Sequence, residues 1–371
     1  MDRLVVEAMQ PYLTQKFYNP SATYLAAKSV REDLNVARRT VASLLGARPI
    51  EVIFTAGGTE ANNQALIGIL QAFPDSHVVT TALEHDSIRA PLEFMAERGW
   101  SQTEVVPKPD GLVEPSKVVA AITDKTVLVS VMYANNEIGT VQPIKRIATA
   151  LQIIRKDRLQ KGNNLPLYFH IDACQAPNYL DLHVHRLGVD LMTLNGGKIY
   201  GPKQSGVLFV ASHVKLMPLV HGGGQEFNRR SGTENVAGII GFTKALEIAV
   251  FKQKSESIRL SKLQNEFMKL LVSRISSVSI NGSVKHRLPN NIHITIPDCD
   301  NERLVFGLDE AGILCSAGSA CSASKDEPSH VLKAIGLSDV RAQSSLRFSM
   351  GRQTTSQDLS DTVRVLAKLV N

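Results

Sequence analysis

Cysteine is scarce in this sequence, and its spacing argues against two classes of protein. The 371 residues include 4 cysteines, too few for the disulfide framework of a small secreted protein. They also lack the paired short spacing of a zinc site. We therefore expect a chain that works in the reducing cytoplasm and binds no metal. The four are Cys174, Cys299, Cys315 and Cys321.

Long apolar runs and blocks of basic residues are also missing. No run approaches the roughly 18 residues that a membrane span needs, and acidic residues interrupt the short apolar stretch at the N-terminus, unlike a signal peptide. The formal net charge is +6, with no arginine-rich or aromatic-interleaved basic stretch. The sequence thus predicts no membrane contact and no direct DNA binding. Its charge is compatible with an acidic protein partner or with transfer RNA, although most such excesses are solvated surface.

Apolar runs do alternate with helical periodicity through the first two thirds of the chain. The hydrophobic fraction is 43% and the charged fraction 20%, as in ordinary soluble globular proteins. Strands that alternate with helices predict an α/β domain with a mostly parallel sheet. The expected strands are 51–55, 77–81, 126–132, 167–171, 189–193 and 206–210, and a helix over 60–70 follows the first.

The C-terminal third has a different pattern. A long amphipathic helix from about Ile239 to Ser276 precedes an alternating stretch at 291–296, which predicts a smaller α+β domain. No Gly/Ser linker separates the two parts. We expect a large domain at residues 14–245 and a small one at 246–371, with residues 1–13 joined to the small domain.

At two of the expected strand ends the residues suit a charged ligand: one suits an anion and the other a positively charged aromatic ring. Gly57-Gly58-Thr59 follows the first strand, and glycine amides at a helix N-terminus can bind a phosphate. Alone, such a turn is more often only a turn. Asp172 ends another buried strand, where a carboxylate needs a partner such as a protonated heteroaromatic nitrogen. A capping role with a backbone partner explains Asp172 equally well in isolation.

Two further strand ends carry a lysine and a flat ring. Lys198, flanked by glycines, could form a Schiff base if its neighbours lower its pKa, although a surface lysine in a turn has the same sequence. His85 could stack on an aromatic ligand or be a satisfied, partly buried histidine. Ligands bind at the carboxyl ends of strands in open α/β sheets, so we expect the four places to converge. A phosphate cradle, an acid, a lysine and a flat ring are together what pyridoxal 5'-phosphate requires.

The sequence resembles a known family, the cysteine desulfurases of the NifS/IscS type, which are class V, fold-type I pyridoxal-phosphate enzymes. The resemblance extends from about Val6 to the C-terminus. It implies a large domain with a mostly parallel seven-stranded sheet and a smaller α+β C-terminal domain. Its motifs are Asn19-Pro20-Ser21, Phe54–Asn62, Asn135–Gly139, Asp172–Gln175, Lys198–Lys203, Gly222–Glu226, Arg230–Asn235, Gly318–Cys321 and Leu346–Arg352.

The resemblance implies a role for each matching residue. Lys198 would bind the cofactor aldehyde, Asp172 would pair with the pyridine nitrogen and Gln175 with the ring hydroxyl. His85 would stack on the ring and assist proton transfer, and Arg347 would grip the substrate carboxylate as a planar fork. The other implied contacts are those of Gly58, Thr59 and Asn195 with the phosphate, of Asn136 with cofactor and substrate, and of Thr233 with the phosphate in the neighbouring subunit's site of an obligate homodimer.

Cys321 lies in a stretch of small residues, Gly318–Ser324, which predicts a mobile loop. Alone, this thiol is as well explained by packing as by reactivity. The resemblance implies that L-cysteine is the substrate, that Lys198 removes its Cα proton, and that the Cys321 thiolate attacks its sulfur. The sulfur stays on Cys321 as a persulfide and alanine leaves. We expect Cys174 and Cys315 to be packing residues.

The sequence departs from the family's pattern at three places. Members usually begin with a strand bearing Asp-Asn-Ala-Ala-Thr-Thr-Pro, whereas this sequence starts after the equivalent point, so either the chain starts late or part of the substrate-pocket wall is missing. Asn195 replaces a serine and can still donate a hydrogen bond. Gly197 replaces a histidine and removes a donor, so weaker cofactor binding is expected.

Three functional alternatives stay open. The leading one is a cytoplasmic cysteine desulfurase that passes sulfur to an iron–sulfur scaffold or to a tRNA-thiolation protein. The second is a selenocysteine lyase or another class V lyase. The third is a weakly active homologue that acts as a dimeric binding platform. The platform alternative is disfavoured because the sequence retains five residues that a binding platform does not need: Lys198, Asp172, His85, Gln175 and Cys321.

Overall fold

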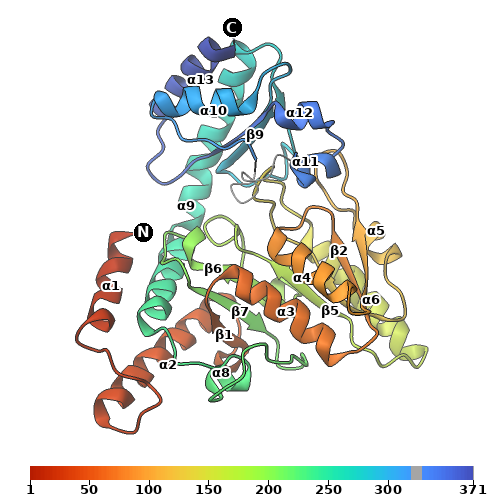
Figure 1. Cartoon of the computed structure of the whole chain (residues 1–371), viewed down its shortest axis with the longest axis vertical. Coiled ribbons are helices and arrows are strands. Elements are labelled where there is room, and N and C mark those ends of the chain that lie inside the picture. The colour runs from red at the N-terminus through yellow and green to blue at the C-terminus, as the bar shows by residue number, and fades with distance from the viewer. Residues whose placement is uncertain (319–327, 371) are drawn as a thin grey trace. The chain divides into compact units, whose positions relative to one another are not determined.

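The computed structural model describes residues 1–318 and 328–370 of the chain (Figure 1). These residues form two compact units. The first comprises Met1–Val105, Pro115–Tyr133 and Ile144–Gln253, and the second comprises Val106–Glu114, Ala134–Pro143 and Lys254–Asn371. Helix α1 (Arg3–Leu13) belongs to the first unit, where the Asp2 amide just before it donates to the Tyr200 carbonyl at 2.8 Å. The domains 14–245 and 246–371, with residues 1–13 in the smaller one, stay a prediction.

A seven-stranded sheet organises the first unit, and the predicted mostly parallel α/β architecture is confirmed. Only β7 is antiparallel to its two neighbours, so the other six strands share one direction. Their carboxyl ends therefore lie along one edge of the sheet. In spatial order the strands are β1 (Val52–Thr55), β7 (Gly206–Val210), β6 (Leu191–Asn195), β5 (Tyr168–Asp172), β4 (Thr126–Ser130), β2 (His77–Thr81) and β3 (Ser101–Val105).

Six of these strands were expected, within a few residues, because they are buried runs of apolar and β-branched side chains. The sequence analysis missed β3. This strand lies at the edge of the sheet, pairs only with β2, and exposes most of its polar side chains. An edge strand of this kind lacks the apolar run by which buried strands are recognised.

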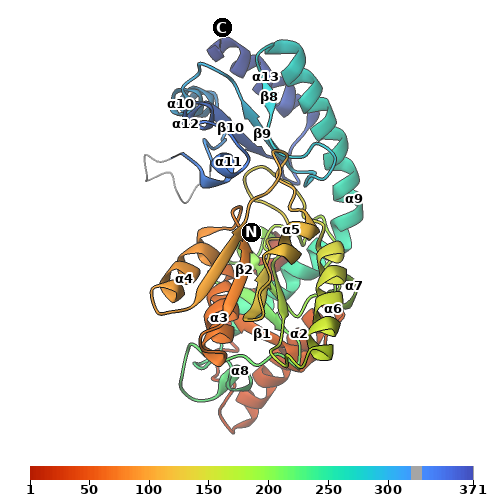
Figure 2. The same cartoon turned by 90° about the vertical axis from the view of Figure 1, so that its right-hand side faces the viewer.

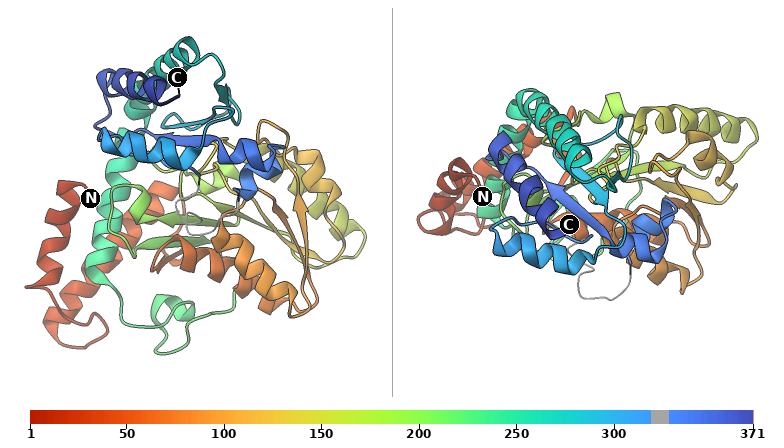
Figure 3. Two further views of the ribbon diagram at one scale, coloured as in Figure 1. Left: turned by 45° about the horizontal axis from the view of Figure 1, so that its top comes forward. Right: turned by 90° about the horizontal axis from the view of Figure 1, so that it is seen from above.

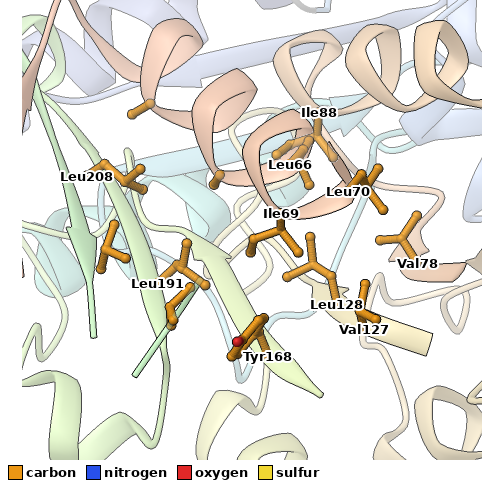
Figure 4. Close-up of a cluster of buried hydrophobic side chains, with 14 of the residues drawn as sticks. Leu66, Ile69, Leu70, Val78, Ile88, Val127, Leu128, Tyr168, Leu191 and Leu208 are labelled. Carbon is orange, nitrogen blue, oxygen red and sulfur yellow. The ribbon is translucent and has the colours of Figure 1, made fainter. Parts of the chain in front are cut away.

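Helices cover both faces of the sheet, with α3 and α4 on one side and α6 and α7 on the other (Figure 2). Leu66, Ile69 and Leu70 of α3 pack against Leu128 and Leu191 of the sheet, in the cluster of fully buried side chains drawn in Figure 4. The helices of this unit are α2 (Leu25–Leu45), α3 (Gly58–Ala72), α4 (Asp86–Ala96), α5 (Pro115–Ala120), α6 (Ile144–Gln160), α7 (Val184–Leu187), α8 (Gln225–Asn228) and the start of α9 (Val236–Arg274), with short 3₁₀ turns η1 (Pro49–Glu51) and η2 (Gly196–Lys198).

The second unit contains the end of α9 and a three-stranded antiparallel sheet in the order β10-β9-β8. Helices α10 and α13 lie side by side in it (Figure 3), where Gly307 leaves room for the Leu369 side chain. In the described residues, no helix is long and apolar enough to cross a membrane. The elements are β8 (Ser279–Ile280), β9 (Asn291–Thr295), β10 (Ser345–Ser349), α10 (Asn301–Glu310), α11 (His330–Ala334), α12 (Asp339–Gln343) and α13 (Ser356–Val370).

A buried ion pair ties α2 to the loop that contains α8. The Arg38 guanidinium forms two parallel hydrogen bonds with the Glu226 carboxylate, at 2.7 and 2.6 Å. It also donates to the Val52 carbonyl, while the Phe54 amide donates to Glu226. Glu226 and Phe227 have positive φ angles of 48° and 61°, which cost energy for residues with a Cβ. The ion pair therefore stabilises a strained loop.

A second buried carboxyl, Glu84, joins the ends of β2 and β4. It accepts hydrogen bonds from the Thr81 hydroxyl at 2.7 Å and from the Met132 amide at 2.8 Å. Complete burial raises the pKa of Glu84 to about 8, and the nearby Asp172 charge adds to this effect. Glu84 is thus protonated in the folded protein at neutral pH.

We predict that Glu226→Gln lowers the free energy of unfolding by about 3 kcal/mol, because it leaves the buried Arg38 charge without its counter-charge. Urea unfolding followed by the fluorescence of Trp100, the single tryptophan, measures the change. Glu32→Gln is the matched control, since Glu32 pairs with Arg39 at the surface and should leave the midpoint unchanged. Equal midpoints for both variants would contradict the role of the buried pair.

We also predict that Glu84→Gln makes the melting temperature less sensitive to pH. The pKa of this glutamate is about 4.5 in the unfolded chain and about 8 in the folded protein. Between these two pH values the unfolded state has lost a proton that the folded state keeps. Stability is therefore lost as pH rises from about 5 to 8. The melting temperature of Glu84→Gln should gain about 2 °C over the wild type for each pH unit in this interval. The exposed Glu97→Gln should show no such trend, and a constant difference for Glu84→Gln would refute the assignment.

Candidate active site

The carboxyl edge of the first unit's sheet brings together the side chains that the sequence analysis singled out there. Strand β1 leads into Gly58, β2 into His85, β5 ends at Asp172, and β6 leads into Lys198. Because these strands share one direction, four segments far apart in the chain end at the same edge.

Gly58 opens α3 and allows other groups to approach its backbone closely. A Cβ atom at this position would lie 2.7 Å from Cys174 Sγ and 3.4 Å from Asn195 Nδ2, so only glycine fits without displacing Cys174. The preceding Gly57 has φ +124°, a conformation that other residues rarely adopt. Gly58 is buried, and Thr59 beside it is exposed. The helix N-terminus with these two glycines suits a bound anion.

Asp172 is 8% exposed and both of its carboxylate oxygens accept hydrogen bonds. The Cys174 amide donates to Oδ1 at 2.9 Å, and Asn62 Nδ2 donates to Oδ2 at 2.8 Å. The backbone partner that the sequence analysis considered is therefore present, together with a side-chain donor. Two fixed donors hold the carboxylate in one orientation. Gln175 follows on the same segment and is half-buried.

His85 is the N-cap residue of α4. Its Nδ1 accepts a hydrogen bond from the Ser87 amide at 3.0 Å and lies 2.9 Å from the Ser87 hydroxyl. The ring is half-buried. A ring anchored through one nitrogen at the sheet edge is suited to stacking on a planar ligand.

Lys198 ends the 3₁₀ turn that follows β6. Its carbonyl accepts a hydrogen bond from Asn178 Nδ2 at 3.1 Å, and its side chain is exposed. Asn195 Oδ1 accepts from the Gly197 amide at 3.0 Å and so closes the turn. The backbone of this lysine is fixed by these contacts, and its charge acts on the nearby Cys174 thiol.

Two neighbouring groups are neutral at physiological pH. His170 bridges Ser130 and Thr193 on the adjacent strands, and burial lowers its pKa to about 4. Burial and the nearby Asp172 charge raise the pKa of the Cys174 thiol well above its usual range. A thiol that stays protonated is a poor nucleophile, which agrees with the expected packing role.

The remaining predicted residues lie elsewhere. In the second unit, Arg347 of β10 donates through Nη1 to the Asn136 carbonyl at 3.2 Å, so the two predicted substrate residues are neighbours. Thr233 is exposed in the first unit, on a loop where Arg230 forms two hydrogen bonds with Glu60 of α3. Cys321 lies outside the described residues.

The sequence analysis missed two residues of this site, Asn62 and Ser87. Asn62 donates to both Asp172 and the Ser87 hydroxyl. A signal was available, because Asn62 lies among apolar residues on the buried face of α3, where a polar side chain needs a specific partner. Ser87, a serine in the first turn of a helix, had no such signal.

The residues of the sheet edge fit pyridoxal 5'-phosphate. The glycine-lined start of α3 suits its phosphate, because the first amides of a helix are free to donate to an anion. The doubly anchored Asp172 suits a protonated ring nitrogen, and the amine of the exposed Lys198 suits its aldehyde.

Known proteins resemble the chain along almost its whole length. Two relatives named cysteine desulfurase IscS, from Dictyoglomus turgidum and Methanosarcina thermophila, are each 40% identical over 368 residues, covering 99% of this chain and 91% and 88% of theirs. A solved NifS-like protein has a TM-score of 0.90 at 28% identity, over 100% of this chain and 96% of its own. The solved SspA in complex with cysteine has a TM-score of 0.80 at 32% identity, over 94% and 95%. The family model for aminotransferase class-V matches residues 1–361, and the chain therefore belongs to this family of pyridoxal-phosphate enzymes.

Proposed function

We propose that this protein is a cysteine desulfurase, which converts L-cysteine to L-alanine and takes the sulfur onto Cys321. The observation that carries the proposal is the convergence of Gly58, His85, Asp172 and Lys198 at one edge of the sheet. The relatives named cysteine desulfurase, at 40% identity over 99% of the chain, support the choice of substrate.

The first unit would hold the cofactor through a few side chains and amides. When bound, pyridoxal 5'-phosphate supplies a conjugated ring that stabilises negative charge at the substrate Cα. Asp172 keeps a proton on the ring nitrogen, since its carboxylate is fixed by two donors. The other contacts are those of Gly58, Thr59 and Asn195 with the phosphate, of Gln175 with the ring hydroxyl, of Asn136 with the cofactor, and of His85 stacked on the ring.

Proton transfer would involve Lys198 and His85. The Lys198 amine would remove the proton from the substrate Cα. His85 assists the later proton transfers from its anchored position at the start of α4. In the second unit, Arg347 binds the substrate carboxylate with its planar guanidinium and Asn136 orients the substrate.

Cys321 would take the sulfur as a nucleophile. Its thiolate forms a bond to the substrate sulfur while the bond between that sulfur and Cβ breaks, and the electron pair of the broken bond stays on the three-carbon fragment. Protonation of this fragment yields alanine, and Cys321 carries the persulfide. Burial raises the pKa of Cys315 to about 11 and that of Cys174 well above its usual range, so both thiols stay protonated and are poor nucleophiles at neutral pH.

The working form would be a homodimer in the cytoplasm. Phe17, in the segment between α1 and α2, and Leu25, the first residue of α2, are 79% and 82% exposed, so both apolar side chains are available for a contact with a second copy. Thr233 would reach the phosphate in the partner's site from its exposed loop. The persulfide would pass to a thiol of an iron–sulfur scaffold or of a tRNA-thiolation protein.

The direct test is to incubate the purified protein with L-cysteine and a reductant. We expect equal amounts of alanine and sulfide, and no product from Lys198→Ala. A yellow protein that forms no alanine would contradict the desulfurase while leaving the cofactor assignment intact. Turnover of L-selenocysteine without turnover of L-cysteine would instead indicate a selenocysteine lyase.

We predict that Cys321→Ser keeps the yellow cofactor but loses sulfide release at least 100-fold, because serine cannot hold a persulfide. Sulfide and alanine assays measure this loss. Cys299→Ser is the matched control and should keep wild-type activity, since Cys299 is a partly exposed cysteine with no proposed role. Sulfide release by Cys321→Ser at the wild-type rate would mean that another thiol carries the sulfur.

A mixture of two inactive variants tests the shared site. Lys198→Ala and Thr233→Ala each damage both sites of their own homodimer, Thr233→Ala through weaker phosphate binding. Unfolding, mixing and refolding them in equal amounts should restore roughly a quarter of wild-type activity, because half of the dimers are mixed and each has one intact site. No recovery, with dimers present by sedimentation, would show that Thr233 does not serve the partner.

A further inference from the structure

We propose that Asn62 and Ser87 are positioning residues that link Asp172 to His85 through one directed chain of hydrogen bonds. The inference rests on the proposed function only in the roles of Asp172 and His85. The chain consists of three contacts: Asn62 Nδ2 to Asp172 Oδ2 at 2.8 Å, Asn62 Nδ2 to Ser87 Oγ at 2.8 Å, and Ser87 Oγ to His85 Nδ1 at 2.9 Å.

The orientation of the Asn62 amide follows from Asp172. A carboxylate only accepts hydrogen bonds, so the amide nitrogen must face it. The reversed amide would place its oxygen against the carboxylate oxygen. Nδ2 carries two hydrogens, and the second one points to Ser87 Oγ.

This orientation has a cost that the structure retains. Asn62 is 1% exposed, and its Oδ1 has no hydrogen-bond partner among the described residues. A buried acceptor without a partner costs on the order of 1–3 kcal/mol. Both donors of Asn62 thus point to groups of the site, while its acceptor has no partner among the described residues.

The state of His85 follows from Ser87. The Ser87 amide can only donate, and it points at His85 Nδ1 at 3.0 Å. Ser87 Oγ accepts from Asn62, so its own hydrogen is available for the same ring nitrogen. Nδ1 is thus an acceptor, and the neutral ring carries its proton on Nε2.

Two consequences follow for the site. The Asp172 carboxylate cannot rotate, because Asn62 and the Cys174 amide hold one oxygen each. The His85 ring keeps one tautomer and presents an Nε2–H group on the side away from Ser87. Neither Asn62 nor Ser87 needs to touch the substrate, so each acts through the group that it orients.

The first test uses the protein without cofactor, so it does not depend on any activity. We expect ¹⁵N spectra of histidine-labelled protein at pH 8 to show His85 with a bare Nδ1 and a protonated Nε2, the signal being assigned by its absence in His85→Gln. The Nδ1 resonance should move in the same direction in Asn62→Ala and Ser87→Ala. It should stay in place in Ser87→Thr, which keeps the hydroxyl. It should also stay in place in Asn63→Ala, which removes a neighbouring amide of the same helix whose one hydrogen bond to the described residues is with the Thr59 carbonyl.

The second test measures cofactor binding and turnover. Asn62→Ala should bind pyridoxal 5'-phosphate about 10-fold more weakly. Without the charge-assisted hydrogen bond from Asn62, the Asp172 carboxylate is no longer held in one orientation towards the ring nitrogen. Asn62→Asp should be weaker still, since it places a second carboxylate beside Asp172. With cofactor saturating, kcat should fall while KM for L-cysteine changes little.

Distinct outcomes would overturn the inference and the proposed function. A His85 ring protonated on Nδ1 in the wild type, or an Nδ1 resonance and cofactor affinity unchanged in a folded Asn62→Ala, would overturn the role of Asn62 and Ser87. Wild-type protein with the expected tautomer and affinity changes but no turnover of L-cysteine would overturn the desulfurase and leave this inference standing.

Discussion

The buried carboxylate of Asp172 is the constraint around which this site is built. A charge at the end of a central strand is costly unless donors surround it, and the chain supplies them from Cys174, two residues further along, and from α3. The donor on α3, Asn62, exists at this place only because the helix starts directly after β1 at Gly58. The glycine turn thus sets the position of the first amides of α3 and of Asn62, the side chain that donates to Asp172.

The common direction of the strands turns these local features into one site. Strands β1, β2, β5 and β6 end at the same edge because they run in the same direction, and α3, α4 and α7 follow β1, β2 and β5 to begin the return across the sheet. The exception, β7, runs back between β1 and β6 and brings Gly206 against the backbone of Gly57. A side chain at Gly206 would displace the Gly57–Gly58 turn that precedes α3. The antiparallel strand therefore supports the site without contributing a reactive group to it.

Much of this arrangement could be predicted from the sequence, and the parts that could not share a physical reason. The central strands and the glycine turn were recognisable because burial on both faces requires apolar runs, and a tight turn before a helix requires glycine. The edge strand β3 was not predicted, because its residues are mostly exposed and polar. The contact of Arg347 with the Asn136 carbonyl joins residues 211 positions apart, and no local pattern encodes such a pairing. Asn62 lay inside a recognised motif, yet its partners became apparent only when α3 and β5 were placed side by side.

The two departures from the family's pattern after β6 are coupled in the structure. Gly197 supplies no side-chain donor, but its amide donates to Asn195 Oδ1. This hydrogen bond uses the side-chain oxygen of Asn195, so the side-chain nitrogen faces Gly58. A Cβ atom built on Gly58 would lie 3.4 Å from that nitrogen. A serine hydroxyl has one oxygen with which to accept and donate, whereas asparagine accepts through Oδ1 and keeps a separate donor in Nδ2. Asn195 thus closes the turn at Gly197 with one atom and keeps its donor group near Gly58.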